Sequence, residues 1–252
     1  MNLNKVTLVG AGPGDPELMT LKGIKALSRA DVILYDALAN EEILDFASKS
    51  ALKIYVGKRC GKRSLKQQDI NSLLVNQVKM NKRVVRLKGG DPFIFGRGFE
   101  EVLHLTALGI EVDIIPGISS STGLTALSGI PLTHRGTSES FWVLTGTTKD
   151  HKLSADIKLA VQSTATLVIL MATRKLELIQ NIFVSIGKES VPFMIIQNGS
   201  SPNERIITGI TGELTQAFDK MIIGDPGILV FGEVVALNQS MALTSKQTEW
   251  IA

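Results

Sequence analysis

The sequence predicts an α/β fold with two domains, and three observations support this. Short apolar runs such as Val6–Val9 alternate with segments of helical periodicity, which is typical of a mainly parallel sheet covered by helices on both faces. Pro116 and Gly117 interrupt this alternation. Beyond them, several strands follow one another without an intervening helix, which predicts a mixed sheet in the second half of the chain.

The interruption at Pro116 sets the expected domain boundaries. We expect an N-terminal α/β domain over residues 1–115 and a C-terminal α/β domain over residues 116–238. The last residues, 239–252, match no recognisable pattern and are expected to form a tail.

Each expected element has its own signal in the sequence. Asp15 is a good N-cap and Pro16 suits a first helical position, so a helix is expected from there to about Arg29. Further helices are expected from about Glu41 and at Gln67–Met80, Gly98–Leu108, Ser119–Ser128, Leu153–Gln162, Leu176–Ile186 and Glu213–Lys220. Strands are expected at Val6–Val9, Val32–Tyr35, Lys53–Val56, Arg83–Leu87, Val112–Ile115, Phe141–Thr145, Leu167–Met171, Phe193–Gln197, Arg205–Ile210 and Ile228–Leu237.

The composition is that of an ordinary globular protein. The chain has 252 residues, of which 44% are hydrophobic and 20% are charged. Its 27 Lys and Arg residues against 24 Asp and Glu residues give a formal net charge of +3. This mild basicity permits an anionic partner without requiring nucleic acid.

Cysteine, histidine and apolar residues limit the possible classes further. Cys60 is the single cysteine, so no internal disulfide can form and a reducing, cytoplasmic location is expected. No apolar run approaches the roughly 20 residues of a membrane helix, and the N-terminus does not resemble a signal peptide. His104, His134 and His151 show no metal-ligand spacing, so we expect no metal. Because the chain has no membrane-length apolar run and only a modest net charge, we also expect no membrane partner and no nucleic-acid partner.

Unusual residues gather where the first five predicted strands end. In open α/β sheets, ligands bind outside the carboxyl ends of the strands. Each of these ends is followed by glycine, proline or ionisable residues, at Gly10–Asp15, Tyr35-Asp36, Gly57–Arg63, Lys88–Pro92 and Pro116-Gly117. Taken singly, each junction is more typical of an ordinary turn or a solvated loop. Their joint occurrence favours a binding site.

The first of these loops, GAGPGD, has the composition of a nucleotide loop but not its spacing. Asp15 stands where the dinucleotide fingerprint has its third glycine, and the Gly-Lys-Ser/Thr of a P-loop is missing. The loop is therefore not predicted to cradle a phosphate.

Longer motifs give the chain a resemblance to a known family. They are VGAGPGD (Val9–Asp15), Tyr35-Asp36, YVGKR (Tyr55–Arg59), RVVRLKGGDPFIFGRG (Arg83–Gly98), GIPLTHR (Gly129–Arg135) and GEVVAL (Gly232–Leu237). With these motifs the chain resembles the uroporphyrinogen-III C-methyltransferases, which are tetrapyrrole methyltransferases that use S-adenosylmethionine. The resemblance implies two α/β domains with the cofactor in the cleft between them, usually as a homodimer. It also implies two successive methylations that give precorrin-2, for sirohaem or cobalamin synthesis.

The resemblance assigns cofactor contacts residue by residue. It implies that S-adenosylmethionine is bound by Pro13, Gly89, Gly90, Asp91, Ile94, Ser119, Ser120, Met171 and Gly199. Two serines stand where the family has a Thr-Ala or similar pair. Leu170-Met171-Ala172 replaces Tyr-Met-Gly, and Gln197-Asn198-Gly199 replaces Glu-Asn-Gly.

The same matching implies that Asp36 is the proton acceptor and Lys58 the proton donor. The substrate carries eight carboxylates, and arginine binds carboxylates in bidentate fashion, so Arg59, Arg97 and Arg135 are expected to hold it. Each arginine could instead be solvated or paired locally. Two other functions remain open: methylation of a later corrin intermediate or of RNA, and a binding module without catalysis.

Overall fold

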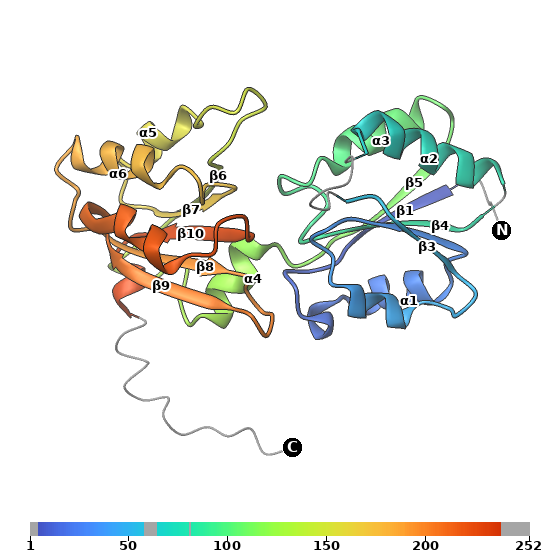
Figure 1. Cartoon of the computed structure of the whole chain (residues 1–252), viewed down its shortest axis with the longest axis horizontal. Coiled ribbons are helices and arrows are strands. Elements are labelled where there is room, and N and C mark those ends of the chain that lie inside the picture. Colours follow the sequence, from blue (N-terminus) through green and yellow to red (C-terminus); the bar gives the residue numbers. More distant parts are fainter. Residues whose placement is uncertain (1–4, 58–64, 81, 238–252) are drawn as a thin grey trace, which may run out of the picture. The chain divides into compact units, whose positions relative to one another are not determined.

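The computed structural model describes residues 5–57, 65–80 and 82–237. The chain divides into two compact units, Met1–Ser119 and Ser120–Ala252. Each unit contains one five-stranded sheet with helices packed on it, which confirms the predicted α/β class (Figure 1).

The sheet of the first unit is entirely parallel, as the alternation of strands and helices predicts. Its strand order is β3-β2-β4-β1-β5. The strands are β1 (Lys5–Gly10), β2 (Val32–Tyr35), β3 (Leu52–Tyr55), β4 (Val84–Lys88) and β5 (Glu111–Ile115). Strand β4 lies inside the sheet, between β2 and β1, and every residue of β4 is buried.

Helices cover both faces of this sheet (Figure 1). On one face, α1 (Leu21–Ser28) and the 3-10 helix η2 (Glu41–Phe46) pack over side chains that include Val85 and Leu87. On the other face, α2 (Gln67–Lys79) and α3 (Gly98–Thr106) pack over side chains that include Val84. Alternate residues of β4 therefore point toward different helices.

The single helix expected from Asp15 to Arg29 is wrong. Asp15 caps only a short 3-10 helix, η1 (Pro16–Leu18), through a bond from the Glu17 amide of 2.8 Å. Met19 and Thr20 then adopt extended backbone, and the Thr20 hydroxyl accepts from the amide of Gly23 at 3.0 Å, so α1 starts anew. Two residues that favour N-caps compete within five positions, and both are used.

The second unit has the mixed sheet that its adjacent strands predict, in the order β6-β7-β10-β8-β9. Strand β6 runs parallel to β7, and the remaining pairs are antiparallel. The strands are β6 (Phe141–Thr145), β7 (Thr166–Leu170), β8 (Pro192–Gln197), β9 (Arg205–Ile210) and β10 (Gly227–Phe231).

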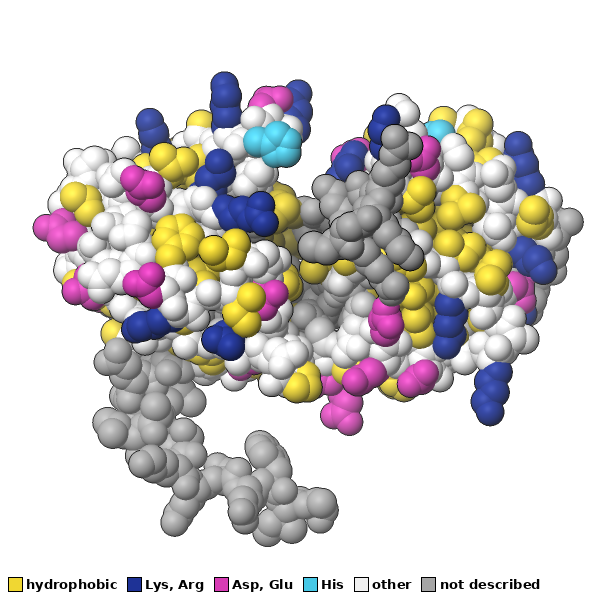
Figure 2. All heavy atoms as spheres, in the orientation of Figure 1, with side chains coloured by type: hydrophobic (Ala, Val, Ile, Leu, Met, Phe, Trp, Pro, Cys, Tyr) yellow, Lys and Arg dark blue, Asp and Glu magenta, His cyan; other side chains and the backbone are white. Residues whose placement is uncertain are grey.

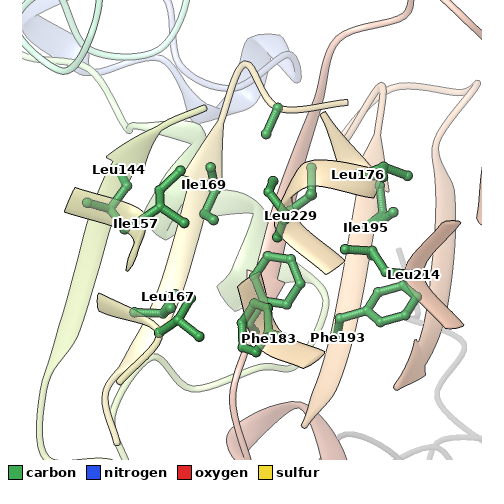
Figure 3. Packing of buried hydrophobic residues seen from close by; sticks show 14 of the residues in the cluster. Leu144, Ile157, Leu167, Ile169, Leu176, Phe183, Phe193, Ile195, Leu214 and Leu229 are labelled. Atoms are coloured by element: carbon green, nitrogen blue, oxygen red, sulfur yellow. The ribbon is translucent and has the colours of Figure 1, made fainter. Parts of the chain in front are cut away.

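The core of the second unit lies mainly under α5 (Asp156–Ala160), α6 (Leu176–Val184) and the 3-10 helix η3 (Thr211–Lys220). Figure 3 shows Phe183 and Phe193 within this cluster, and both rings lie close to Phe231, at centroid distances of 5.0 and 6.4 Å. The helix α4 (Ser120–Leu127) packs on the opposite face, against a cluster that includes Val168 and Ile196.

The strand expected over Ile228–Leu237 is too long. It ends at Phe231, because Gly232 has a φ of 136° and residues 234–237 turn helical. The helices expected from Glu41 and over Glu213–Lys220 are present as 3-10 helices.

The visible surface of each unit carries Lys, Arg, Asp and Glu side chains interspersed with hydrophobic ones (Figure 2). Within residues 5–57, 65–80 and 82–237, the structure contains no helix with both the length and the apolar character that a membrane crossing requires.

Candidate functional site at the strand ends

The carboxyl ends of β1, β2, β3, β4 and β5 meet at one edge of the first sheet, because all five strands are parallel. The sequence predicts that their loops converge there. Hydrogen bonds between loops that lie far apart in the sequence now describe how three of them fit together.

The loops after β1 and β4 are joined through two glycines. The amide of Gly12 donates to Gly90 O at 3.2 Å, and the amide of Gly90 donates to Gly12 O at 2.7 Å. Both residues have left-handed backbone, with φ of 75° and 63°. Residues with side chains are disfavoured in this conformation, and glycine has none. The backbone of the bridge is therefore not covered by side chains of its own, next to Pro13 in one loop and Asp91 in the other.

Other glycines at this edge serve packing within the protein. A Cβ on Gly117 would lie 2.3 Å from Gly90 O, and a Cβ on Gly10 would lie 2.4 Å from the Gly117 nitrogen. Both distances are far below van der Waals contact. Gly10 and Gly117 therefore allow three backbone segments to touch, which is a structural reason for their presence.

Asp91 uses both carboxylate oxygens to hold backbone. Oδ1 accepts from the amide of Phe93 at 2.8 Å, and Oδ2 accepts from the amide of Gly117 at 3.1 Å. Asp91 thus fixes the turn that follows Gly90 and ties it to the loop after β5.

Asn40 supports the GAGPGD loop and was not singled out by sequence reasoning. Its Nδ2 donates to Gly14 O at 3.0 Å, while its Oδ1 accepts from the Glu42 amide at the start of η2. The N-cap role is readable from the sequence. The contact with Gly14 is not, because the two residues are 26 positions apart.

Asp36 follows β2 and, among the described residues, is held by three donors. Its Oδ1 accepts from the amides of Leu38 at 3.2 Å and Gly89 at 3.3 Å, and its Oδ2 accepts from Arg86 Nη2 at 3.3 Å. The side chain is 24% exposed, so it is accessible at the edge of the sheet.

Behind Asp36 lies a buried group of ionic residues that sequence reasoning also missed. Arg86 Nε and Lys88 Nζ approach Glu101 Oε1 at 3.1 and 3.3 Å, and Gln67 donates to the same oxygen at 3.0 Å. Burial, together with the neighbouring Arg86 charge, lowers the pKa of Lys88. The available signal was a pair of cations inside the otherwise apolar strand β4.

The segment after Asp91 is exposed and has unusual backbone. Phe95 and Arg97 adopt left-handed φ of 52° and 57°, and Ile94 is 44% exposed. Arg97 forms a bidentate pair with Glu100, at 2.9 and 2.7 Å. Hydrogen bonding to Glu100 raises the pKa of Arg97. The local pairing that the sequence left open is thus present.

In the second unit, Met171 and Gly199 follow β7 and β8. These strands are parallel to each other, since both run antiparallel to β10, so the two residues lie at the same sheet edge. Met171 is left-handed with φ of 56°, and its carbonyl accepts from Thr147 Oγ1 at 2.8 Å. A Cβ on Gly199 would lie 2.5 Å from Leu124 of α4, so this glycine has a packing role.

The remaining predicted residues lie elsewhere or outside the described part of the chain. Ser119 and Ser120 stand at the junction of the two units, and Ser120 begins α4. Arg135 is exposed in a tight turn that the His134–Ser138 bridge closes. Lys58, Arg59 and the neighbouring Cys60 lie outside the described residues. Within the described ranges, no group of three or more His, Cys, Asp or Glu side chains is placed to hold a metal ion.

Fold and sequence together define the class. A parallel sheet with glycine-rich loops at its carboxyl edge, followed by a mixed sheet, describes an α/β protein of the kind found among methylases of tetrapyrroles. The chain belongs to the family of Tetrapyrrole (Corrin/Porphyrin) Methylases, whose family model matches residues 5–215.

Relatives in this family match over nearly the whole chain. The uroporphyrinogen-III C-methyltransferase of Methanocaldococcus jannaschii is 47% identical over 233 residues, which cover 92% of this chain and 96% of that protein. A siroheme synthase of Actinobacillus pleuropneumoniae is 45% identical over 97% of this chain. The chain spans only 50% of the length of that synthase.

Solved structures give the same assignment. The uroporphyrin-III C-methyl transferase of Thermus thermophilus, complexed with S-adenyl homocysteine, superimposes with a TM-score of 0.79 at 38% identity. The alignment covers 92% of this chain and 99% of that one.

Proposed function

We propose that this protein is a uroporphyrinogen-III C-methyltransferase. It transfers two methyl groups from S-adenosylmethionine to ring carbons of uroporphyrinogen-III and so forms precorrin-2, an intermediate for sirohaem or cobalamin. The observation that carries the proposal is the paired Gly12–Gly90 edge, formed by GAGPGD and KGGDP, in a chain 47% identical to an enzyme of that name.

The residues present fit the methyl donor. S-Adenosylmethionine supplies an electrophilic methyl group when bound, so the protein must place that group near the acceptor carbon and exclude water. Gly12 and Gly90 have left-handed backbone and no side chain, so a ligand can approach their backbone closely beside Pro13. Gly89, Gly90, Asp91 and Ile94 are proposed contacts in the first unit, and Met171 and Gly199 in the second. Ser119 and Ser120 complete the proposed set.

Asp36 is the proposed proton acceptor. When an electron-rich, fully substituted ring carbon receives the methyl group, the macrocycle gains a positive charge, and one proton must leave elsewhere in the ring system to restore neutrality. Among the described donors only Arg86 bonds Asp36 Oδ2, so this carboxylate oxygen has a second lone pair for a proton. Lys58 is the proposed proton donor; it lies outside the described residues.

Arginines are proposed to bind the acetate and propionate groups of the substrate. Arg97 is exposed and its guanidinium is oriented by Glu100, which leaves further donors of its five for a carboxylate. Arg135 is exposed in its turn. Arg59 is a proposed third contact from sequence alone. We further propose a cytoplasmic homodimer, with the single cysteine in support of the compartment.

The proposal is tested by anaerobic incubation of the pure protein with uroporphyrinogen-III and S-adenosylmethionine carrying a ¹³C-labelled methyl group. We expect a product whose mass has risen by two labelled CH₂ increments. A parallel reaction with a later corrin intermediate and one with RNA serve as substrate controls. No mass gain with uroporphyrinogen-III, or gain only in a control reaction, would contradict the proposal.

A further inference from the structure

Arg86 connects the buried interior of the first unit to the edge where Asp36 lies. Residues 84, 86 and 88 alternate with 85 and 87 along β4, so Arg86 and Lys88 share the face covered by α2 and α3. Glu101 lies in the first turn of α3 on that same face. A single guanidinium therefore has Glu101 on one side and Asp36 on the other.

The contacts of Arg86 leave its guanidinium little freedom. Nε donates to Glu101 at 3.1 Å, Nη1 donates to Leu87 O at 2.8 Å, and Nη2 donates to Asp36 Oδ2 at 3.3 Å. The Arg86 and Glu101 side chains are only 3% and 0% exposed. Because the guanidinium is planar, fixing Nε and Nη1 also fixes the direction in which Nη2 points.

Stability alone is a weak reason for this arrangement. Desolvating a buried ion pair costs about as much as the pairing returns, and apolar residues of similar volume often replace such pairs without loss. Asp36, in contrast, gains a defined orientation: Gly89 and Leu38 hold Oδ1, while Arg86 holds Oδ2. Removing Arg86 would leave the carboxylate free to rotate about its Oδ1 contacts.

We propose that Arg86, anchored by Glu101, is a positioning residue that sets the orientation of the Asp36 carboxylate for proton acceptance. This inference rests on the proposed function, in which Asp36 accepts the proton. Arg86 does not need to touch the substrate, since it acts through Asp36.

A double-mutant cycle on kcat tests this role. D36N is expected to lower kcat by roughly 10²–10⁴-fold, as loss of a general base does. R86M is expected to lower kcat about 10²-fold through misorientation. Because Arg86 acts through Asp36, the double variant should match D36N alone within about twofold. If R86M does not fold, R86K replaces it, since lysine lacks the planar fork needed to hold Glu101 and Asp36 at once.

A matched pair lies immediately before the same two strands. Arg83 and Asp31 precede β4 and β2 and form a bidentate pair at 3.0 and 2.7 Å, near the opposite strand ends. R83M and D31N, singly and together, should leave kcat within about twofold of wild type, because this exposed pair is remote from the proposed site. Calorimetric titration with S-adenosylhomocysteine adds a second readout. R86M should keep the dissociation constant within about threefold, because Asp36 Oδ1 still accepts from the amide of Gly89, which is a proposed donor contact.

The outcomes separate the two proposals. If the wild-type protein is active, either of two results would overturn the positioning role. One is a double variant in which the losses of D36N and R86M multiply, and the other is an R86M variant with full kcat. Loss of donor binding in R86M would also overturn it, by showing that Arg86 supports the donor loop instead. A wild-type protein that methylates no tetrapyrrole would contradict the proposed function itself, and this role with it.

Discussion

The amide of Gly117 donates to Asp91 Oδ2 at 3.1 Å, and through this bond the loop after β5 is tied to the loop after β4. Gly117 can approach this closely because it has no side chain. The backbone of Gly10, at the end of β1, also lies close to Gly117, since a Cβ on Gly117 would be 2.7 Å from it. Three strand ends are thus held in one arrangement by close backbone contacts and by the Asp91 carboxylate, and the proposed donor site is built on that arrangement.

The first prediction concerns this contact. G117A places a Cβ 2.3 Å from Gly90 O and 2.7 Å from Gly10 backbone, and backbone cannot move aside as a side chain can. We expect a loss of about 2–3 kcal/mol of stability, toward the upper end for overpacking. Urea unfolding followed by circular dichroism measures it. G212A is the control, since its Cβ would lie no closer than 3.2 Å to another atom; equal losses in both variants would contradict the packing account.

The second prediction concerns Lys88. Burial and the neighbouring Arg86 charge lower the pKa of Lys88 from the ordinary 10.5. The folded protein therefore binds this proton less tightly than the unfolded chain does. The contribution of Lys88 to the free energy of unfolding is lowest where the folded and the unfolded protein both carry this proton. That contribution rises as the pH increases toward 10.5. The free energy of unfolding of wild type should thus rise relative to K88M as the pH rises from neutral toward 10.5. Parallel urea titrations at several pH values provide the comparison, and a constant difference would exclude the effect.

The third prediction concerns the exposed pair of Asp31 and Arg83. Hydrogen bonds from the Arg83 side chain and backbone lower the pKa of Asp31 from 3.8 to about 2. This carboxylate therefore stabilises the fold fully above pH 3.8, and the contribution disappears as the pH falls through about 2. D31N should be less stable than wild type at neutral pH, and the gap should close in acid. D113N, which removes a carboxylate that pairs with Lys5, is the comparison variant. A gap for D31N that widens in acid would refute the assignment.

The fourth prediction concerns substrate binding by Arg97. R97A removes a charged donor worth about 1.5–3 kcal/mol, so the KM for the macrocycle should rise roughly 10- to 100-fold. The KM for S-adenosylmethionine should change little. Steady-state kinetics with each substrate varied in turn separate the two effects, and R83A controls for loss of a surface arginine. Unchanged kcat and KM in R97A would remove this residue from the site.

Much of the fold could be predicted from the sequence because periodicity reports burial. Strands β6 and β9 lie at the expected bounds, and α2 ends within one residue of its expected end. The predictions of two elements were wrong for local reasons. Asp15 and Thr20 are both good caps, and the sequence does not say that both are used. The apolar run after Ile228 continues past Gly232, whose φ of 136° ends the strand.

Residues of the candidate site could be predicted only where they follow strand ends. Asp36 and the loop of Gly89, Gly90 and Asp91 could be found in this way. Arg86 and Glu101 could not, because a buried ion pair between residues 15 positions apart is indistinguishable in sequence from two solvated charges. The packing roles of Gly10 and Gly117 were equally hidden, since their contacts join separate loops.

A crystal structure of the protein with S-adenosylhomocysteine, the demethylated donor, would show directly whether the donor binds at this edge of the first sheet. We expect this ligand to lie against Pro13 and the turn of Gly89, Gly90 and Asp91. Density for the ligand at any other part of the chain, with this edge of the first sheet free, would contradict it.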